Sequence, residues 1–142
     1  MTPDLESLFP GLRGTEYRAT SPADGRYNCL AWAAGDQSRW WWPDAESYWP
    51  YKEYRWEWIS CFLQAFSLLG FSECDAIHDD GADYIALFAD DDARILHAAR
   101  RLPNGRWTSK LGELVDMEHD LHALEGTQYG KVEFLLRRPR TS

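Results

Sequence analysis

The sequence predicts one α+β domain over residues 1–142, with N-terminal helices packed on a mostly antiparallel sheet of four or five strands. Three observations predict it. The length of 142 residues is that of one ordinary domain. Apolar residues make up 44% of the chain, which is enough to build a core. Apolar residues recur at helical spacing in the first half of the chain, whereas the second half contains short apolar runs separated by turns.

The first half of the chain carries the predicted helices. Its first 25 residues are interrupted by proline and glycine, which predicts a short helix followed by irregular chain. Asn28 is placed to cap a helix that holds Cys29 in its first turn and ends at Gly35. Residues 38–51 combine tryptophan with proline and predict a packed loop. The clearest helix is Glu53 to Leu69, because its apolar residues recur at i, i+3 and i+4 spacing.

The second half carries the predicted strands and one late helix. Pro103, Asn104 and Gly105 form a strong hairpin signal, and Glu113 to Leu124 is interpreted as a helix. The expected strands are Cys74 to Ile77, Tyr84 to Ala89, Arg94 to Leu102, Arg106 to Leu111 and Lys131 to Arg137.

The charge balance excludes several classes of partner. Asp plus Glu outnumber Lys plus Arg by 23 to 15, and the net charge of −8 repels nucleic-acid phosphates. No apolar run is long enough for a membrane span, and the N-terminus lacks the basic and apolar segments of a signal peptide. We therefore expect a cytoplasmic protein without nucleic-acid or membrane partners. No glycine-rich phosphate loop is present, and no cofactor is predicted.

The three cysteines, Cys29, Cys61 and Cys74, differ in predicted setting. Their odd number argues against a closed disulfide framework, and no CxxC pair supports a zinc site. Cys29 alone lies at a predicted helix start, where free N–H groups and the helix dipole favour a thiolate. The alternative is that Cys29 is a buried core residue, as most cysteines in apolar helices are.

His97 is the best candidate for the base that a reactive thiol needs. It lies at the head of a predicted strand before the hairpin, from which its side chain can reach a helix packed on the sheet. Ser109 lies opposite on the return strand. Because alternate residues share a face, Ser109 should lie on the His97 face and orient the imidazole.

At these residues the sequence resembles the papain-like cysteine peptidases, and the NlpC-type branch in particular. That branch carries Asp-Cys-x-x-aromatic at a helix start, and the matching segment here is Asn28 to Trp32. A histidine at a strand start and a polar third residue beyond a small hairpin follow in that branch. The resemblance implies Cys29 as nucleophile, His97 as base, Ser109 as the orienting group, and Tyr17 or Tyr27 at the oxyanion.

The resemblance also implies a papain-like core and an amide or peptide substrate, with two departures. The branch prefers His, Asn, Asp or Gln as third residue, so Lys110, Glu113 or Asp116 are alternatives to Ser109. The Trp-rich loop and the long helix in mid-chain are not typical of it. The whole string also looks like a bacterial domain family of unassigned function, which adds no mechanism.

The run of Trp40, Trp41 and Trp42 has two interpretations. Exposed rings would form a platform for a sugar, a peptide or a protein partner. Buried rings would form a lid that completes the core. We favour a mostly buried lid in which Trp40 and Trp42, beside Asn28, line a cleft near Cys29.

A second cluster contains Asp116, His119 and His122. On the predicted helix these residues are three positions apart and could share a metal ion. Carboxylates and histidines on a surface helix are more often a solvated face, and we predict no metal site. His119 or Asp116 could instead approach His97 as a supporting group.

Two functions from different classes follow. The first is a cysteine hydrolase or amidase that uses Cys29 and His97 for peptide or isopeptide hydrolysis, deamidation or acyl transfer. The alternative is a non-catalytic acidic binding module, such as an immunity-type protein that neutralises a basic partner, with the tryptophan loop as its anchor. The enzyme needs a cleft at Cys29 with His97 in reach, whereas the binding module needs an exposed aromatic patch.

Overall fold

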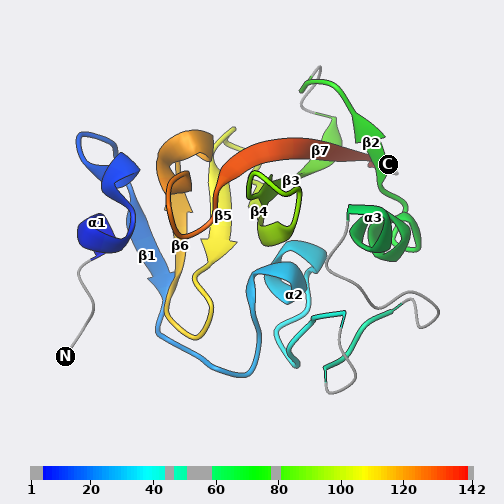
Figure 1. Cartoon of the computed structure of the whole chain (residues 1–142), viewed down its shortest axis with the longest axis horizontal. Coiled ribbons are helices and arrows are strands. Elements are labelled where there is room, and N and C mark those ends of the chain that lie inside the picture. Colours follow the sequence, from blue (N-terminus) through cyan, green and yellow to red (C-terminus); the bar gives the residue numbers. More distant parts are fainter. Residues whose placement is uncertain (1–4, 44–46, 51–58, 78–80, 141–142) are drawn as a thin grey trace.

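The computed structural model describes residues 5–43, 47–50, 59–77 and 81–140, and its main element is one seven-stranded antiparallel sheet. The strand order is β1-β6-β5-β4-β3-β7-β2, which runs across Figure 1 from one end of the molecule to the other. The strands are β1 (Arg18–Ser21), β2 (Ser72–Cys74), β3 (Ala82–Ala89), β4 (Ile95–Arg101), β5 (Trp107–Lys110), β6 (Asp116–His119) and β7 (Lys131–Pro139).

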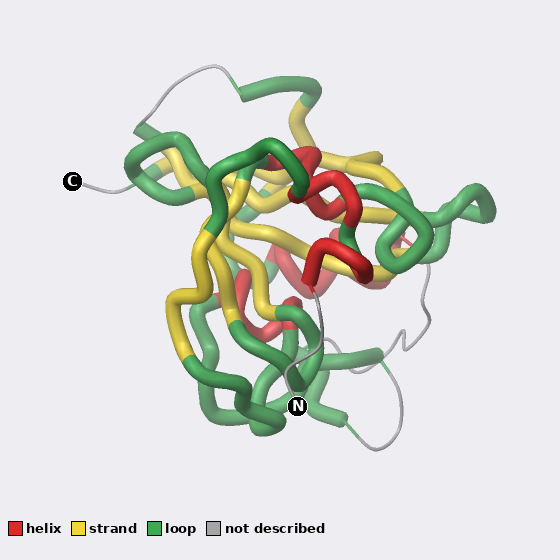
Figure 2. The backbone as a smooth tube through the Cα atoms, turned by 90° about the vertical axis from the view of Figure 1, so that its left-hand side faces the viewer, coloured by secondary structure: helices red, strands yellow, loops and turns green. Residues whose placement is uncertain are grey.

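This architecture corrects the predicted fold class. The domain is mostly β, and the prediction of a helix-rich α+β domain with a papain-like core on four or five strands was wrong. The helical segments are short: α1 (Leu5–Leu8), η1 (Pro10–Leu12), α2 (Cys29–Ala34), α3 (Ile59–Ser67) and η2 (Leu121–Leu124). They appear in Figure 2 as small red segments beside the yellow strands. In the described residues, no helix has both the length and the apolar character that crossing a membrane requires.

The central strands follow the apolar runs of the sequence. In β3, seven of the eight residues are buried, because the strand pairs with β4 on one edge and β7 on the other and is covered on both faces. The turn at Pro103, Asn104 and Gly105 joins β4 to β5 as predicted, and Gly105 takes a φ of 85° there.

Two strands were not expected. The segment interpreted as a helix over Glu113 to Leu124 contains β6, which pairs with β5 and β1, and then η2. Pairing with two neighbours supplies β6 with ladder hydrogen bonds that outweigh the helix propensity of Met117 and Glu118. β1 was missed because its Arg-Ala-Thr-Ser sequence is polar and largely exposed, as an edge strand can be.

Two apolar clusters cover the two faces of the sheet. One contains α2, α3 and buried rings of the tryptophan loop, among them Trp41 and Trp49. The other contains η1, η2, Phe88 and Met117. The predicted helix Glu53 to Leu69 is described from Ile59, where α3 begins, and its earlier part lies outside the described residues.

Candidate active site at Cys29 and His97

Cys29 is the first residue of α2, and its neighbour Asn28 holds the start of that helix in place. The Asn28 side chain accepts the backbone N–H of Ala31 at 3.2 Å, which caps the helix. It also accepts the N–H of Trp41 at 3.1 Å and donates to the Trp41 carbonyl at 2.6 Å. The tryptophan loop is therefore fastened to the helix start, and the Asn28 amide is fully engaged in structure.

A pocket of about 320 Å³ opens at the Cys29 side chain. Trp40 and Trp42 line it, as predicted for the tryptophan loop, whereas Trp41 is buried in the core. The lining residues are Asn28, Cys29, Trp40, Trp42, Leu96, Gly112 and Tyr129. The thiol thus meets a small, largely aromatic cavity.

The thiol itself is protonated at neutral pH. Burial raises the pKa of Cys29 from 9.0 to about 11, and the backbone N–H groups of Ala98 and Leu30 only partly oppose this shift. We expected the helix start to lower the pKa, and that expectation was wrong. With six residues α2 is too short to supply a strong dipole, and desolvation of the sulfur outweighs it.

His97 lies in β4 with its ring between two aromatic side chains. The Tyr129 ring stacks on the imidazole with centroids 3.9 Å apart and planes 6° apart, and the Phe88 ring meets it edge-on at 5.0 Å. Alternation along β4 sends Ala98 into the cluster that contains Cys29 and sends His97 to the Phe88 side of the sheet. The imidazole is fully buried.

A chain of hydrogen bonds runs from His97 through Ser109 to His119. His97 Nε2 lies 2.9 Å from Ser109 Oγ, which lies 2.7 Å from His119 Nε2. His119 Nδ1 lies 2.7 Å from the carbonyl oxygen of Asp120. The sequence placed Ser109 beside His97 and named His119 or Asp116 as groups that could approach His97; the structure brings Ser109 and His119 into this chain.

The proton positions in this chain follow from the chemistry of its last acceptor. A carbonyl only accepts, so His119 donates through Nδ1–H. Burial lowers the pKa of His119 from 6.5 to about 4, so its ring is neutral near pH 7 and its Nε2 accepts the Ser109 hydroxyl hydrogen. Ser109 Oγ then accepts His97 Nε2–H.

This arrangement leaves the His97 Nδ1 lone pair unused. Among the residues that the structure describes, no group forms a hydrogen bond to this buried nitrogen. Burial and the neighbouring His119 lower the pKa of His97 well below 6.5. The imidazole is therefore neutral and presents one bare lone pair, which is the form that can accept a proton.

The Cys29 sulfur and the His97 imidazole lie on opposite faces of β4, near the point where β4 separates from β5, and His97 is not among the residues that line the Cys29 pocket. Within these described strands, backbone pairing is confined to Arg100 and Arg101 of β4. Beyond them the Ala98 N–H, in the peptide that follows His97, is directed at the Cys29 sulfur. Tyr129 contributes to both groups, since it stacks on His97 and lines the Cys29 pocket. The sulfur is not hydrogen-bonded to Nδ1, so the two must move closer before a proton can pass.

The two tyrosines that the resemblance implied for the oxyanion form hydrogen bonds with carboxylates instead. The Tyr17 hydroxyl donates to Glu6 Oε2 at 2.6 Å, and the Tyr27 hydroxyl donates to Asp116 Oδ2 at 2.8 Å. The tyrosine in the Cys29 pocket is Tyr129, which the sequence analysis missed. A signal was present, because Tyr129 lies in a glycine-flanked segment typical of a tight loop.

The other proposed third groups also lie apart from His97. Lys110 donates to the carbonyls of Gly112 and Leu114 at 2.6 and 2.5 Å, which fixes the loop after β5. Asp116 accepts from Tyr27 and from Thr20 on the α2 side of the sheet. No contact of Glu113 with His97 is found among the described residues.

The structure gives no support to a metal site among Asp116, His119 and His122. The described residues contain no cluster of three potential ligands. Asp116 and His119 are three positions apart on a strand instead of a helix, and their side chains consequently lie on opposite faces. His122 lies on the surface, with its Nδ1 3.1 Å from Glu125 Oε2.

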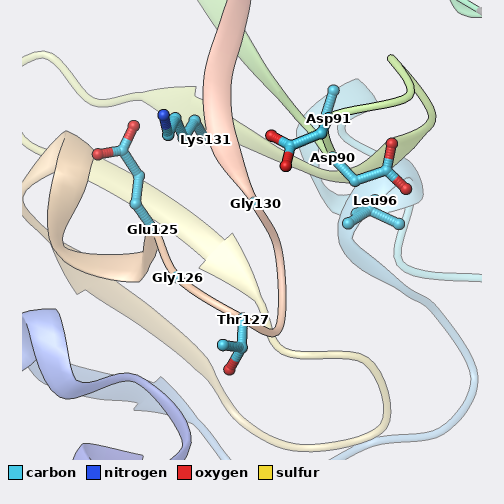
Figure 3. A pocket seen from close by; sticks show the side chains of 9 residues that line it. Asp90, Asp91, Leu96, Glu125, Gly126, Thr127, Gly130 and Lys131 are labelled. Carbon is cyan, nitrogen blue, oxygen red and sulfur yellow. The ribbon is translucent and has the colours of Figure 1, made fainter.

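A second pocket, of about 520 Å³, adjoins the first at Leu96 and at the loop 126–130. Figure 3 shows Asp90 and Asp91 beside the Gly130 strand segment, with Glu125 and Lys131 across it. The Asp90 carboxylate is already engaged by the backbone N–H groups of Asp92 and Arg94. The Asp90 carboxylate therefore stabilises the turn between β3 and β4.

Comparisons with known proteins place the chain in a family. No curated protein and no solved structure matches it at a significant level. One family model matches residues 18–137, a range that runs from β1 into β7 and includes Cys29, His97, Ser109, His119 and Tyr129. The chain therefore belongs to the family described as "Domain of unknown function (DUF7689)".

Proposed function

We propose that the protein is a thiol-dependent acyl-transfer enzyme that hydrolyses an amide, with Cys29 as nucleophile and His97 as general base. The observation that carries the proposal is the unpaired, buried Nδ1 of His97, in the residue next to Ala98, whose backbone N–H is directed at the Cys29 sulfur. A buried lone pair without a donor is costly, and such groups are concentrated at functional sites.

The resting pair would be a neutral thiol and a neutral imidazole. Substrate entry into the pocket would bring sulfur and Nδ1 together, and Nδ1 would take the thiol proton as Sγ attacks the carbonyl carbon. The C–N bond then breaks, and His97 returns the proton to the leaving amine, which leaves a thioester on Cys29. Water attacks this thioester with Nδ1 again as base, and the acid and the free thiol are released.

Two donors are available for the oxyanion. The backbone N–H of Cys29 belongs to the first turn of α2, whose N–H groups have no partner within the helix. The Tyr129 hydroxyl belongs to a side chain of the same pocket. Both would donate to the oxygen that becomes negative as Sγ adds to the carbonyl. Trp40 and Trp42 would hold an apolar or planar acyl group against the thiol.

Acetylation by p-nitrophenyl acetate tests the proposal without knowledge of the substrate. The wild type should release p-nitrophenolate and gain one acetyl group on Cys29, located by peptide mass spectrometry. His97→Gln should slow this step by on the order of 10²–10⁴-fold, the usual contribution of a positioned base. His122→Gln is the matched control, because the His122 side chain lies on the surface beside Glu125.

Cys74 supplies an internal reference within each sample. This half-buried thiol lines a separate pocket beside β7 and has no histidine assigned to it. Acetyl groups found on Cys74 in preference to Cys29, or a Cys29 rate unchanged in a folded His97→Gln variant, would remove the proposed mechanism. Far-UV circular dichroism establishes that each variant is folded.

The binding-module alternative has less support. It needs an exposed aromatic patch, yet Trp41 and Trp49 are buried, and the exposed large hydrophobic side chain among the described residues is Leu68. Binding of a basic protein partner stays a prediction from the charge of −8. We propose a cytoplasmic location for the enzyme, because its three cysteines are free and a reducing compartment preserves thiols.

A further inference from the structure

We infer that His119 is a positioning residue that sets the tautomer of His97 through Ser109, and so keeps Nδ1 as the proton-accepting nitrogen. The inference deepens the proposed function, on which its catalytic meaning rests. The hydrogen-bond geometry that carries it is independent of whether Cys29 reacts.

The Asp120 carbonyl, the last acceptor of the hydrogen-bond chain, determines which way each hydrogen is donated. The Asp120 carbonyl lies 2.7 Å from His119 Nδ1 and can only accept, so a neutral His119 has a lone pair on Nε2. That lone pair lies 2.7 Å from Ser109 Oγ and fixes the hydroxyl hydrogen toward His119. The remaining lone pairs of Ser109 then accept from His97 Nε2, 2.9 Å away.

Without His119 the direction of the chain would be lost. A serine hydroxyl both donates and accepts, so Ser109 alone does not choose between the two tautomers of His97. A free Ser109 hydroxyl would donate to His97 Nε2, which moves the ring proton to Nδ1. The nitrogen that faces no partner would then carry the proton and could not take one from a thiol.

Because these side chains are buried, the protein and not the solvent determines the tautomer of His97. His97, Ser109 and His119 are all fully buried, so water does not offer alternative partners. The rings of Phe88 and Tyr129 on His97 limit rotation of the imidazole. The chain crosses β4, β5 and β6, which are neighbours in the sheet, and each strand supplies one member.

Nitrogen-15 NMR of the histidine rings tests the inference, because protonated and bare ring nitrogens resonate far apart. The wild type near pH 7 should show His97 with hydrogen on Nε2 and His119 with hydrogen on Nδ1. His119→Leu should shift His97 toward the Nδ1–H form. His119→Gln should retain the Nε2–H form, since its side-chain carbonyl can accept the Ser109 hydroxyl hydrogen.

The outcomes separate this inference from the proposed function. A wild-type His97 with hydrogen on Nδ1, or a folded His119→Leu variant that keeps the Nε2–H form, would overturn the inference. The wild-type spectrum alone decides the first point even if His119→Leu does not fold. Recorded in Cys29→Ser, the same spectra do not depend on thiol chemistry, so an inert Cys29 would count against the proposed function only.

If the inference and the proposed function both hold, the acetylation rate of Cys29 should depend on which ring nitrogen of His97 carries the hydrogen. His119→Leu should be slower by at least about tenfold, within the range that a misplaced base proton produces, and His119→Gln should restore most of the wild-type rate. A merely structural role for His119 would give equal rates in two variants of equal stability.

Discussion

The Tyr129 ring lies flat on the imidazole of His97, with ring centroids 3.9 Å apart and planes within 6° of parallel. The same side chain lines the pocket of Cys29, and Phe9 and Phe88 flank it at 5.0 and 6.5 Å. Tyr129 is therefore the side chain that both stacks on His97 and lines the pocket of Cys29. Its loop is closed by reciprocal backbone hydrogen bonds between Gly126 and Gly130.

Removal of the Tyr129 ring should loosen both groups. Tyr129→Ala deletes a side chain packed among three rings and should lower the free energy of unfolding by about 2–4 kcal/mol, somewhat less than for a fully buried aromatic residue, because Tyr129 is only partly buried. Tyr129→Phe keeps the stack and should cost less than about 1 kcal/mol. Urea denaturation measures both. Equal losses in the two variants would show that the hydroxyl, and not the ring, holds this loop.

The loop at Gly130 has no room for a larger residue. A Cβ at Gly130 would lie 2.0 Å from the Ala89 carbonyl oxygen, and its φ of 72° disfavours other residues. This close approach fixes where Tyr129 lies relative to β3. The Tyr129 position is thus set by backbone contacts in addition to ring packing.

Asn28 should be important for stability and for the geometry at Cys29. Asn28→Ala removes the cap of α2 and leaves the N–H and carbonyl of Trp41 unpaired, which should cost about 2–4 kcal/mol. Urea denaturation measures this loss. Asn28→Ser keeps a side-chain oxygen that can cap the helix and should cost less than Asn28→Ala. Indistinguishable losses in the two variants would contradict the proposed role of the side-chain oxygen.

Stability should fall on mild acidification. The pKa values of His97 and His119 are lowered in the folded protein, so between pH 6.5 and about 4 the unfolded chain binds protons that the folded chain does not. The contribution is complete above pH 6.5 and is lost as the pH falls; for His119 alone the loss is about 3 kcal/mol by pH 4.

Urea denaturation between pH 4 and pH 8 measures this slope. His119→Gln should flatten it, because a glutamine does not titrate. An unfolding free energy that is constant over this range in the wild type would contradict the buried, neutral state of both imidazoles.

Part of the fold could be predicted from the sequence because it depends on local signals. The apolar runs of β3 and β7 and the Pro-Asn-Gly turn after β4 are such signals. β6 is different, since Asp116, Met117, Glu118 and His119 have no strand pattern of their own. These residues form a strand because β1 and β5 lie on either side, and this pairing is not readable from a single segment.

The candidate site was likewise predictable from the sequence only in part. The spacing of His97 and Ser109 across a hairpin placed them on one face, as the structure has them. Because β6 was interpreted as a helix, the sequence grouped His119 with His122 and named it beside His97 only as an alternative to Asp116, whereas His119 lies beside Ser109. Tyr129 reaches Cys29 through a loop whose path depends on the whole sheet. The raised pKa of Cys29 likewise follows from burial, which a helix cap does not reveal.

The most direct test of the central claim is the alkylation rate of Cys29 by iodoacetamide against pH, in the wild type and in His97→Gln. The pKa of the thiol is about 11, so an unassisted sulfur should react slowly at pH 7–8. The wild type should react at least about tenfold faster than His97→Gln there. The two rates should converge near pH 11, where the thiolate forms without a base. Identical rates of the folded proteins at every pH would contradict the claim that His97 serves Cys29.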